Sequence, residues 1–170
     1  GGEGEEKIGI AALVSPGTQS AATALGGDYV KYTHPERGFS VEYPRELEVL
    51  RYPEKDNAET ILFQRPGDNP SAPPEEKLGF QIFIAAFDYD GALTKDKIVR
   101  DIPGLKIEDI IDVVLGDGTR ALLFWSESLA FGRSREVWFA ADGYLYEITT
   151  YAHLDSWLAK ILSTWSRNAP

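Results

Sequence analysis

The dipeptide Asp142-Gly143, set between two runs of alternating residues, constrains the fold more than any other feature of this chain. A two-residue type I′ turn needs a positive φ at both central positions, and Asp-Gly is one of the few pairs that adopt it readily. We therefore expect a β-hairpin with strands at Ser134–Ala141 and Tyr144–Tyr151. In that register apolar residues face each other on one side of the sheet: Ala141 with Tyr144, Phe139 with Tyr146, and Val137 with Ile148. That side is predicted to be core, and the other side is mixed.

Further strands are predicted by short runs of β-branched and aromatic residues that end at Pro, Gly, Asn or Asp. These runs are Tyr29–Thr33, Phe39–Tyr43, Glu48–Tyr52, Thr60–Gln64, Leu78–Phe87, Asp109–Leu115 and Thr119–Leu129. The stretch Pro66–Lys77 contains several prolines and is predicted to be a loop.

Two helices complete the predicted order. Thr94 is a suitable N-cap for a helix at Lys95–Asp101 that Pro103 and Gly104 close. The last helix carries apolar residues at spacings of three and four, namely Leu154, Trp157, Leu158, Ile161, Leu162 and Trp165. Either Asp155 or Ser156 is expected to cap it. Such a stripe covers a sheet face; a helix lying on a membrane surface is the alternative, although only Lys160 and Arg167 are basic there. The sequence thus predicts an α+β fold with a mainly antiparallel sheet flanked by helices.

With 170 residues, 43% of them apolar, the chain is long enough for one substantial core. Residues 1–27 are rich in Gly, Ser, Ala and Glu and are predicted to be a flexible leader, followed by one domain at residues 28–168. Within the leader, the apolar residues 8–14 are either part of a longer anchor region or a strand that docks on the domain.

Upstream processing is also expected, because the chain contains no methionine. Any signal peptide or anchor would then lie in a removed upstream part. The longest apolar run, Phe80–Phe87, is too short to span a membrane.

The formal charge of −10 argues against a nucleic-acid partner, because the field of the protein repels phosphate backbones. The absence of cysteine excludes disulfides, thiolate metal sites and cysteine nucleophiles. We expect no cofactor and no resident metal.

Several short patterns resemble functional motifs, but each has a simpler structural interpretation. The run Gly116–Ala121 matches G-x-G-x-x-A, yet it opens a predicted strand instead of a helix, which favours a hairpin turn. The run Asp88–Gly91 resembles part of a calcium loop but lacks the closing glutamate, so we interpret it as a loop. His34 and His153, the only two histidines, are expected to serve in a turn and at a corner.

The mixed face of the predicted sheet holds the candidate interaction residues. Trp138 beside Leu145 is the first candidate for a partner site, if the indole ring is exposed. Glu136 and Glu147 share that face, and a pair of carboxylates can carry out acid–base chemistry where burial separates their pKa values. Exposed strand carboxylates without a catalytic role are the simpler expectation for this pair.

The start of the chain's globular part resembles the PsbP-like family, named for the extrinsic protein of the photosystem II oxygen-evolving complex and related to the Mog-type import factor. The resemblance rests on Tyr32, Gly38, Phe39, Ser40, Tyr43 and Pro44, and at the other end on Tyr146–Tyr151, Ala152 and Trp157–Trp165. It covers about residues 29–165 and implies an α/β/α sandwich. Leu47, where the family often has Trp, and the loop Pro66–Lys77 depart from the pattern, which weakens the inference of a photosystem role.

Three function classes follow from these observations. The preferred one is a non-enzymatic, extracytoplasmic domain that is tethered through its leader and binds a protein partner. The second is a carrier of a small ligand or lipid, with an apolar pocket between helix and sheet. The third is a hydrolase, which requires His34 or His153 within hydrogen-bonding reach of a carboxylate or serine in a cleft.

Overall fold

The computed structural model describes residues 7–14, 27–89 and 91–167. Within these residues an eight-stranded sheet has the order β1-β7-β8-β9-β10-β6-β5-β4. Neighbouring strands are antiparallel, except that β1 runs parallel to β7. The strands are β1 (Ile8–Gly9), β4 (Glu48–Pro53), β5 (Glu59–Gln64), β6 (Gly79–Ala86), β7 (Glu108–Val114), β8 (Arg120–Ser128), β9 (Gly132–Ala141) and β10 (Tyr144–Tyr151).

A second, two-stranded sheet pairs β2 (Tyr29–Thr33) with β3 (Ser40–Pro44). The helices are α2 (Lys95–Asp101) and α3 (Asp155–Leu162), with short 3₁₀ turns η1 (Ile10–Leu13), η2 (Lys55–Asn57), η3 (Pro74–Glu76) and η4 (Ala152–Leu154). The α+β class and the mainly antiparallel sheet predicted from the sequence are confirmed. No helix among the described residues is long and apolar enough to cross a membrane.

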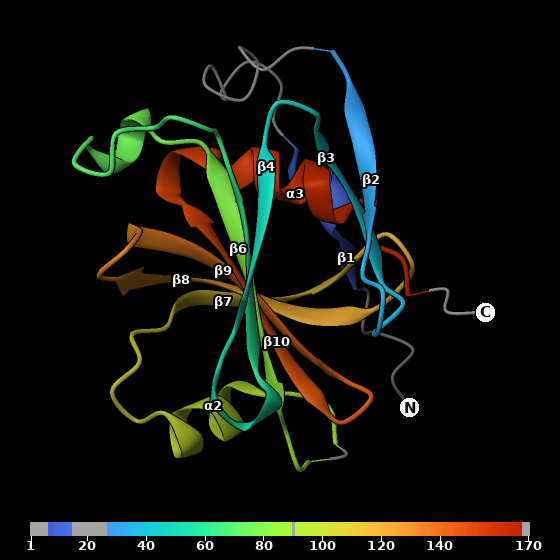
Figure 1. Ribbon diagram of the computed structural model, residues 1–170. Helices are drawn as coiled ribbons and strands as arrows, with labels where there is room; N and C mark the ends of the chain where they lie inside the picture. The colour runs from blue at the N-terminus through green and yellow to red at the C-terminus, as the bar shows by residue number, and fades with distance from the viewer. Residues whose placement is uncertain (1–6, 15–26, 90, 168–170) are drawn as a thin grey trace.

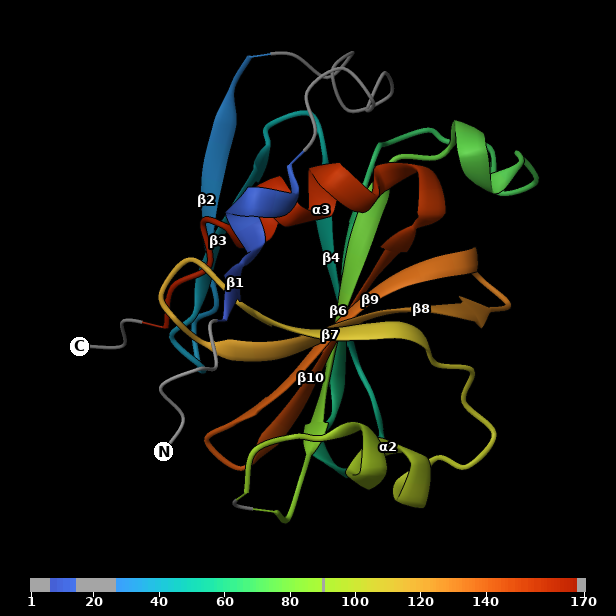
Figure 2. The ribbon, with the colours of Figure 1, turned by 180° about the vertical axis from the view of Figure 1, so that it is seen from behind.

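The strands have apolar residues on both faces, and each face has its own core. The larger core joins the sheet to α3 and to the β2–β3 hairpin and includes Phe39, Trp157 and Trp165. The smaller core lies toward α2, where Ile98 packs with Phe124 and Trp138. Figures 1 and 2 both show α3 on one side of the strands and α2 on the other.

The turn at Asp142 and Gly143 has the predicted geometry. Their φ angles are 53° and 82°, so both residues occupy the left-handed region that a type I′ turn requires. The strand register is also confirmed, with Ala141 opposite Tyr144, Phe139 opposite Tyr146 and Val137 opposite Ile148. The N-cap of α2 is confirmed as well, since the Thr94 Oγ1 accepts a hydrogen bond from the Lys97 amide at 3.1 Å.

The predicted cap of the last helix is wrong. The N-cap position of α3 is Leu154, and no side chain accepts a hydrogen bond there. The turn η4 leads directly into α3, so Asp155 is already helical and its Oδ1 accepts a hydrogen bond from the Arg135 Nε at 2.8 Å. The side chain that the sequence offered as a cap therefore joins the helix to β9.

Residues 8–14 dock on the domain, which is one of the two alternatives drawn from the sequence. Ile8 and Gly9 pair in parallel with Val113 and Val114 at the edge of the sheet. Ile10 follows and is 1% exposed within the larger core. The division into a leader at 1–27 and a domain at 28–168 stays a prediction, because residues 1–6, 15–26 and 168–170 lie outside the described residues.

Candidate functional site

Trp138 and Leu145, the predicted binding residues, are both buried. Trp138 is 4% exposed and Leu145 is 9% exposed, because Ile98 of α2 and flanking apolar residues cover this part of the sheet. The Trp138 Nε1 donates a hydrogen bond to the Glu136 Oε1 at 2.9 Å, so its one polar atom is also occupied. The condition that the indole ring be exposed is not met in this structure, and binding at these two residues stays a prediction.

Glu136 and Glu147 share the same sheet face. Burial raises the pKa of Glu136, although hydrogen bonds to its carboxyl from neighbouring side chains oppose the shift. Burial, with a contribution from the Glu136 charge, raises the pKa of Glu147 to about 7. Glu136 is 6% exposed, and its carboxyl accepts hydrogen bonds from Trp138 and Thr149. These surroundings block access by a substrate.

His34 is held in the turn between β2 and β3 by both of its ring nitrogens. The backbone amides of Glu36 and Arg37 donate hydrogen bonds to His34 Nδ1 at 3.1 and 3.0 Å. Nδ1 is therefore an acceptor, and the proton lies on Nε2, which donates to the Glu59 Oε1 at 2.5 Å. The imidazole is 2% exposed.

Glu59, on β5, connects this turn to two arginines. Arg51 Nη2 donates to Glu59 Oε2 at 2.8 Å, and Arg37 Nε donates to Oε1 at 3.2 Å. Burial by itself would raise the pKa of Glu59, but the hydrogen bonds from Arg51, His34 and Arg37 outweigh it and hold the pKa below the ordinary value. Burial holds the pKa of His34 below its ordinary value, against the opposing effect of Glu59.

This network meets the distance criterion set for a hydrolase, because His34 lies within hydrogen-bonding reach of a carboxylate. A general base, however, needs a free ring nitrogen that faces the nucleophile. Both nitrogens of His34 are occupied, and no serine or threonine hydroxyl among the described residues hydrogen bonds to it. The arrangement is suited to fixing three segments of chain together instead of activating a nucleophile.

The remaining motifs also take structural positions. His153 contacts the Lys77 carbonyl through Nε2 at 2.9 Å, which ties the Pro-rich loop to the corner before α3. Residues Gly116–Gly118 form the predicted hairpin turn between β7 and β8, and a Cβ at Gly116 would lie 2.1 Å from the Ser163 carbonyl oxygen. Gly116 thus allows the turn to approach the end of α3. No group of three or more potential metal ligands occurs among the described residues.

A concave surface that the sequence did not reveal surrounds Tyr144. Three hollows share this residue in their linings, with volumes of about 510, 530 and 330 Å³. They bring together the β9–β10 turn, the loop after β6, the β2–β3 turn and the β4–β5 connection. We name this surface the Tyr144 groove and define it by Glu36, Arg37, Asp88, Tyr89, Asp142 and Tyr144.

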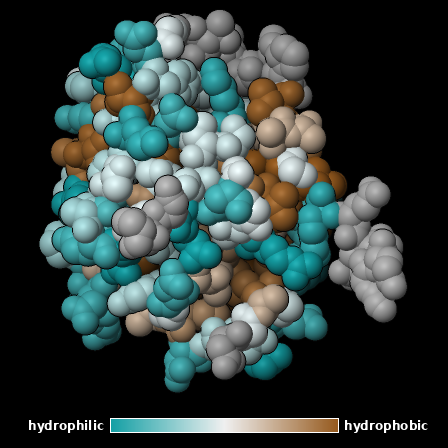
Figure 3. Space-filling view, turned by 90° about the vertical axis from the view of Figure 1, so that its right-hand side faces the viewer, coloured by the Kyte–Doolittle hydropathy of each residue, from teal (hydrophilic) through white to brown (hydrophobic). Residues whose placement is uncertain are grey.

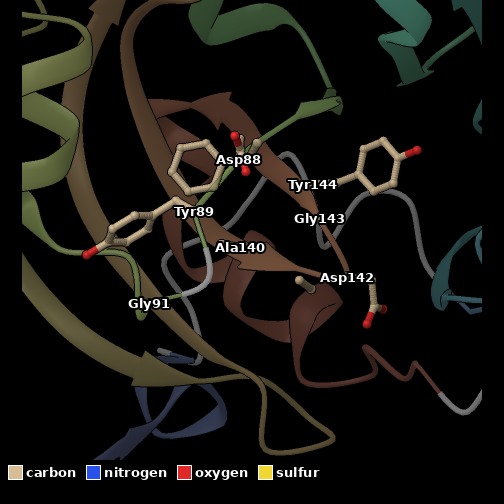
Figure 4. Close-up of a pocket in the computed structure, with 9 residues that line it drawn as sticks. Asp88, Tyr89, Gly91, Ala140, Asp142, Gly143 and Tyr144 are labelled. Atoms are coloured by element: carbon tan, nitrogen blue, oxygen red, sulfur yellow. The ribbon is translucent and has the colours of Figure 1, made fainter.

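Figure 4 shows the part of the Tyr144 groove between the β9–β10 turn and the loop after β6, with Tyr89 and Tyr144 on either side in this view. The Arg37 guanidinium lies 4.1 Å from the centroid of the Tyr144 ring. The side of the molecule that carries the β2–β3 hairpin is mostly hydrophilic, with apolar residues visible in patches (Figure 3). A surface with aromatic rings and charged groups has the composition common to protein-binding sites.

The sequence offered signals for only part of this groove. The Asp142-Gly143 turn and the loop at Asp88 were each predicted, but their proximity depends on the antiparallel pairing of β10 with β6, which places Tyr144 opposite Ala86. Arg37 and Glu36 come from a turn more than a hundred residues earlier in the chain. No local pattern indicates that these segments meet.

Comparison with protein-family models gives no match, and comparison with curated proteins gives none either. Among solved structures, the chain is similar to the solution structure of cyanobacterial PsbP (CyanoP) from Synechocystis sp. PCC 6803, with a TM-score of 0.54 and 11% sequence identity. The similarity covers 85% of this chain and 99% of that chain. The chain has a PsbP-like fold.

The residues behind the sequence resemblance hold the PsbP-like fold together. Gly38 has a φ of 74° and closes the β2–β3 turn, and the next residue, Phe39, stacks on Trp165 with ring centroids 4.6 Å apart. The two ends of the motif pattern therefore meet in one core. Leu47, which departs from the family pattern, is also buried at 4% exposure.

Proposed function

We propose that this chain is a non-enzymatic, extracytoplasmic protein-binding domain, tethered through its N-terminal leader, and that the Tyr144 groove is its binding surface. We further propose that the sheet and its two helices form the α/β/α sandwich that the PsbP-like resemblance implies. The observation that carries it is the convergence of three adjoining hollows on one aromatic residue, Tyr144. Aromatic anchors at the centre of a concave patch contribute much of the affinity of many interfaces.

The state of the two histidines supports the non-enzymatic part of the proposal. His34 has no free nitrogen, and His153 contacts a backbone carbonyl outside the groove. The carboxyls of Glu136 and Glu147 lie on the sheet face toward α2 and line none of the three hollows. The groove is therefore suited to recognition more than to acid–base chemistry.

A carrier role has less support. The side of the sheet under α3, where an apolar pocket was expected, is filled by packed side chains: Leu158 is 1% exposed, and Ile161 and Leu162 are both at 0%. Phe80 meets Trp157 there with ring centroids 5.8 Å apart. The three hollows of the Tyr144 groove open to the surface instead.

Site-specific photo-crosslinking tests the proposed surface. A photoreactive phenylalanine analogue replaces Tyr144 in the intact exported protein, and a matched variant carries it at Leu129, which is fully exposed at the other end of β9. We expect a specific partner to be linked at position 144 and not at 129. Identical crosslinked products from both positions would refute the assignment of the groove.

The compartment is tested separately, by locating the intact gene product. Protection of the chain from protease until the outer layers of the cell are opened would support an extracytoplasmic location. A full-length product that starts at this leader, without a signal peptide or anchor, would refute it.

A further inference from the structure

The part of the Tyr144 groove next to the β9–β10 turn is acidic. Its lining includes the carboxylates of Asp88 and Asp142, and no lysine or arginine lines it. Asp88 is exposed, and no described basic side chain forms an ion pair with it. The adjoining hollow adds the carboxylates of Glu36 and Glu54.

The arginines near this surface are already engaged by acidic groups of the same chain. Arg37 and Arg51 both donate to Glu59, and Arg167 Nη1 donates to the Asp142 Oδ2 at 2.8 Å. Glu36, with its side chain 67% exposed, lies 3.5 Å from Arg51 Nη2, which also donates to Glu59, and 3.3 Å from the His34 Nδ1. The groove therefore keeps an excess of negative charge, in a protein whose formal charge is −10.

The aromatic rings of the groove already hold cations in this structure. The Arg37 guanidinium lies over Tyr144, and the Lys97 ammonium lies 4.8 Å from the centroid of the Tyr89 ring. Tyr89 is still 38% exposed, so part of the ring faces solvent. Carboxylates beside accessible aromatic rings attract ammonium and guanidinium groups through both Coulomb and cation–π interactions.

From this charge complementarity we propose that the Tyr144 groove binds a segment of a partner protein that presents arginine or lysine side chains. The inference rests on the proposed protein-binding function and specifies the chemistry of the partner. The hollows open to the surface and share Tyr144 in their linings, so neighbouring hollows can accept successive side chains of one chain segment. Acidic segments and nucleic acids are repelled from the same surface.

Binding of a labelled arginine-rich peptide, followed by fluorescence anisotropy with the full chain, tests the proposal. The comparison peptide has glutamine in place of each arginine. Asp88→Asn and Tyr144→Ala alter the groove, Tyr144→Phe keeps the aromatic face, and Glu46→Gln makes the same charge change as Asp88→Asn at an exposed position outside the groove-lining residues. Circular dichroism confirms that each variant is folded.

We expect the arginine peptide to bind and the glutamine peptide not to bind, with affinity that falls as salt is added. Asp88→Asn should weaken binding about threefold and Tyr144→Ala about fivefold, in the range of exposed ion pairs and cation–π contacts. Tyr144→Phe and Glu46→Gln should stay within about twofold of the original chain.

Three results would overturn the proposal. One is an equal loss in Glu46→Gln and Asp88→Asn, which would assign the attraction to the net charge of the whole molecule. Another is unchanged binding in Tyr144→Ala. The third is competition by free spermidine at concentrations as low as those of the peptide, which would identify a small amine as the ligand.

The crosslinking experiment separates this inference from the proposed function. A partner linked at position 144 through a segment without basic residues would refute the inference and leave the protein-binding function intact. The absence of any specific link at position 144 would refute both.

Discussion

His34 owes its role to the hydrogen bonds at its two ring nitrogens. The turn amides of Glu36 and Arg37 make Nδ1 an acceptor, and Glu59 takes the proton on Nε2, so the neutral imidazole is the form that fits. Protonation would place an N–H on Nδ1 against the two turn amides, and the Glu36 Oε2, 3.3 Å from Nδ1, offsets that repulsion only in part, because the pKa of His34 stays below its ordinary value. From the sequence, a histidine at this position is compatible with a catalytic role or with a structural role in a turn. Only the contacts of its ring distinguish these two roles.

Replacement of His34 should alter the dependence of stability on pH. Burial lowers its pKa, so the unfolded chain takes up a proton first as the pH falls below about 6.5, and the folded state loses stability in that window. His34→Asn keeps an acceptor for the turn amides, and His34→Gln keeps a donor to Glu59. Each variant should lose about 1–2 kcal/mol near neutral pH and show a flatter pH dependence below 6.5, measured by urea unfolding.

The pH profile of His34 can be distinguished from those of its neighbours. Glu59, whose pKa is lowered, contributes stability that is lost only as the pH falls below about 4.5, the ordinary value for a glutamate. Burial also lowers the pKa of His153. Its contribution to the pH dependence is the same in the original chain and in both His34 variants, so it cancels when their stabilities are compared. Equal slopes for the original chain and both variants between about pH 5 and 6.5 would contradict the account of His34.

Among the secondary-structure elements, β1 and η1 are the least expected part of the fold. They come from a stretch with leader composition on both sides, yet Ile10 reaches the larger core and η1 packs against α3. Among the described residues, Ile8 and Gly9 are the ones that pair with the outer edge of β7. The binding of this segment therefore depends more on one buried side chain than on strand pairing.

Ile10→Ala should destabilise the protein by about 2–4 kcal/mol, unless the segment detaches first and limits the loss to its docking free energy. Ile8→Ala is the matched control, because Ile8 is 42% exposed, and it should change stability by about 0.5 kcal/mol or less. Thermal and urea unfolding provide the measurement. A loss in Ile10→Ala as small as that expected for Ile8→Ala would contradict the prediction.

The α2 segment decides the environment of the other sheet face. Its apolar residues cover Trp138 and Leu145. The carboxyls of Glu136 and Glu147 share that face, and no basic side chain is among the groups that shift their pKa values. A pattern of alternating residues identifies this face, but it does not say whether another element covers it. For that reason the sequence left open whether Trp138 is exposed, and the structure shows that it is buried.

Glu147→Gln should stabilise the protein at alkaline pH. The folded-state pKa of about 7 lies above the ordinary value of 4.5, so the contribution of Glu147 to stability is largest below pH 4.5 and falls as the pH rises to 7. Glutamine removes that fall, and the gain near pH 8 should reach about 2–3 kcal/mol. Glu46→Gln, at an exposed position, should show no comparable gain in urea unfolding. Equal stability of Glu147→Gln and the original chain at pH 8 would contradict the prediction.

The molecule as a whole has two cores that share the same strands. Successive residues of β8, β9 and β10 alternate between them: Leu122 and Leu123, Trp138 and Phe139, and Leu145 and Tyr146. Neither core can lose its strands without exposing the other. Cooperative loss of both is therefore expected.

Fluorine NMR of protein labelled with 5-fluorotryptophan tests this coupling. Trp138 reports on the smaller core, and Trp157 and Trp165 report on the larger one. Their native resonances should disappear at the same urea concentration. Earlier loss of the Trp138 resonance would mean that the α2 segment opens first, which would make Trp138 and Leu145 accessible for the binding predicted from the sequence.

Local chemistry in the sequence determined the hairpin at Asp142 and Gly143, the cap at Thr94, most strand positions and the α+β class, because turn geometry and alternation act over a few residues. The tertiary structure alone decided the docking of Ile10, the burial of Trp138, the fixed neutral form of His34 and the Tyr144 groove. Each of these depends on contacts between segments far apart in the chain. Burial and proximity are properties of the packed sheet, so no local pattern records them.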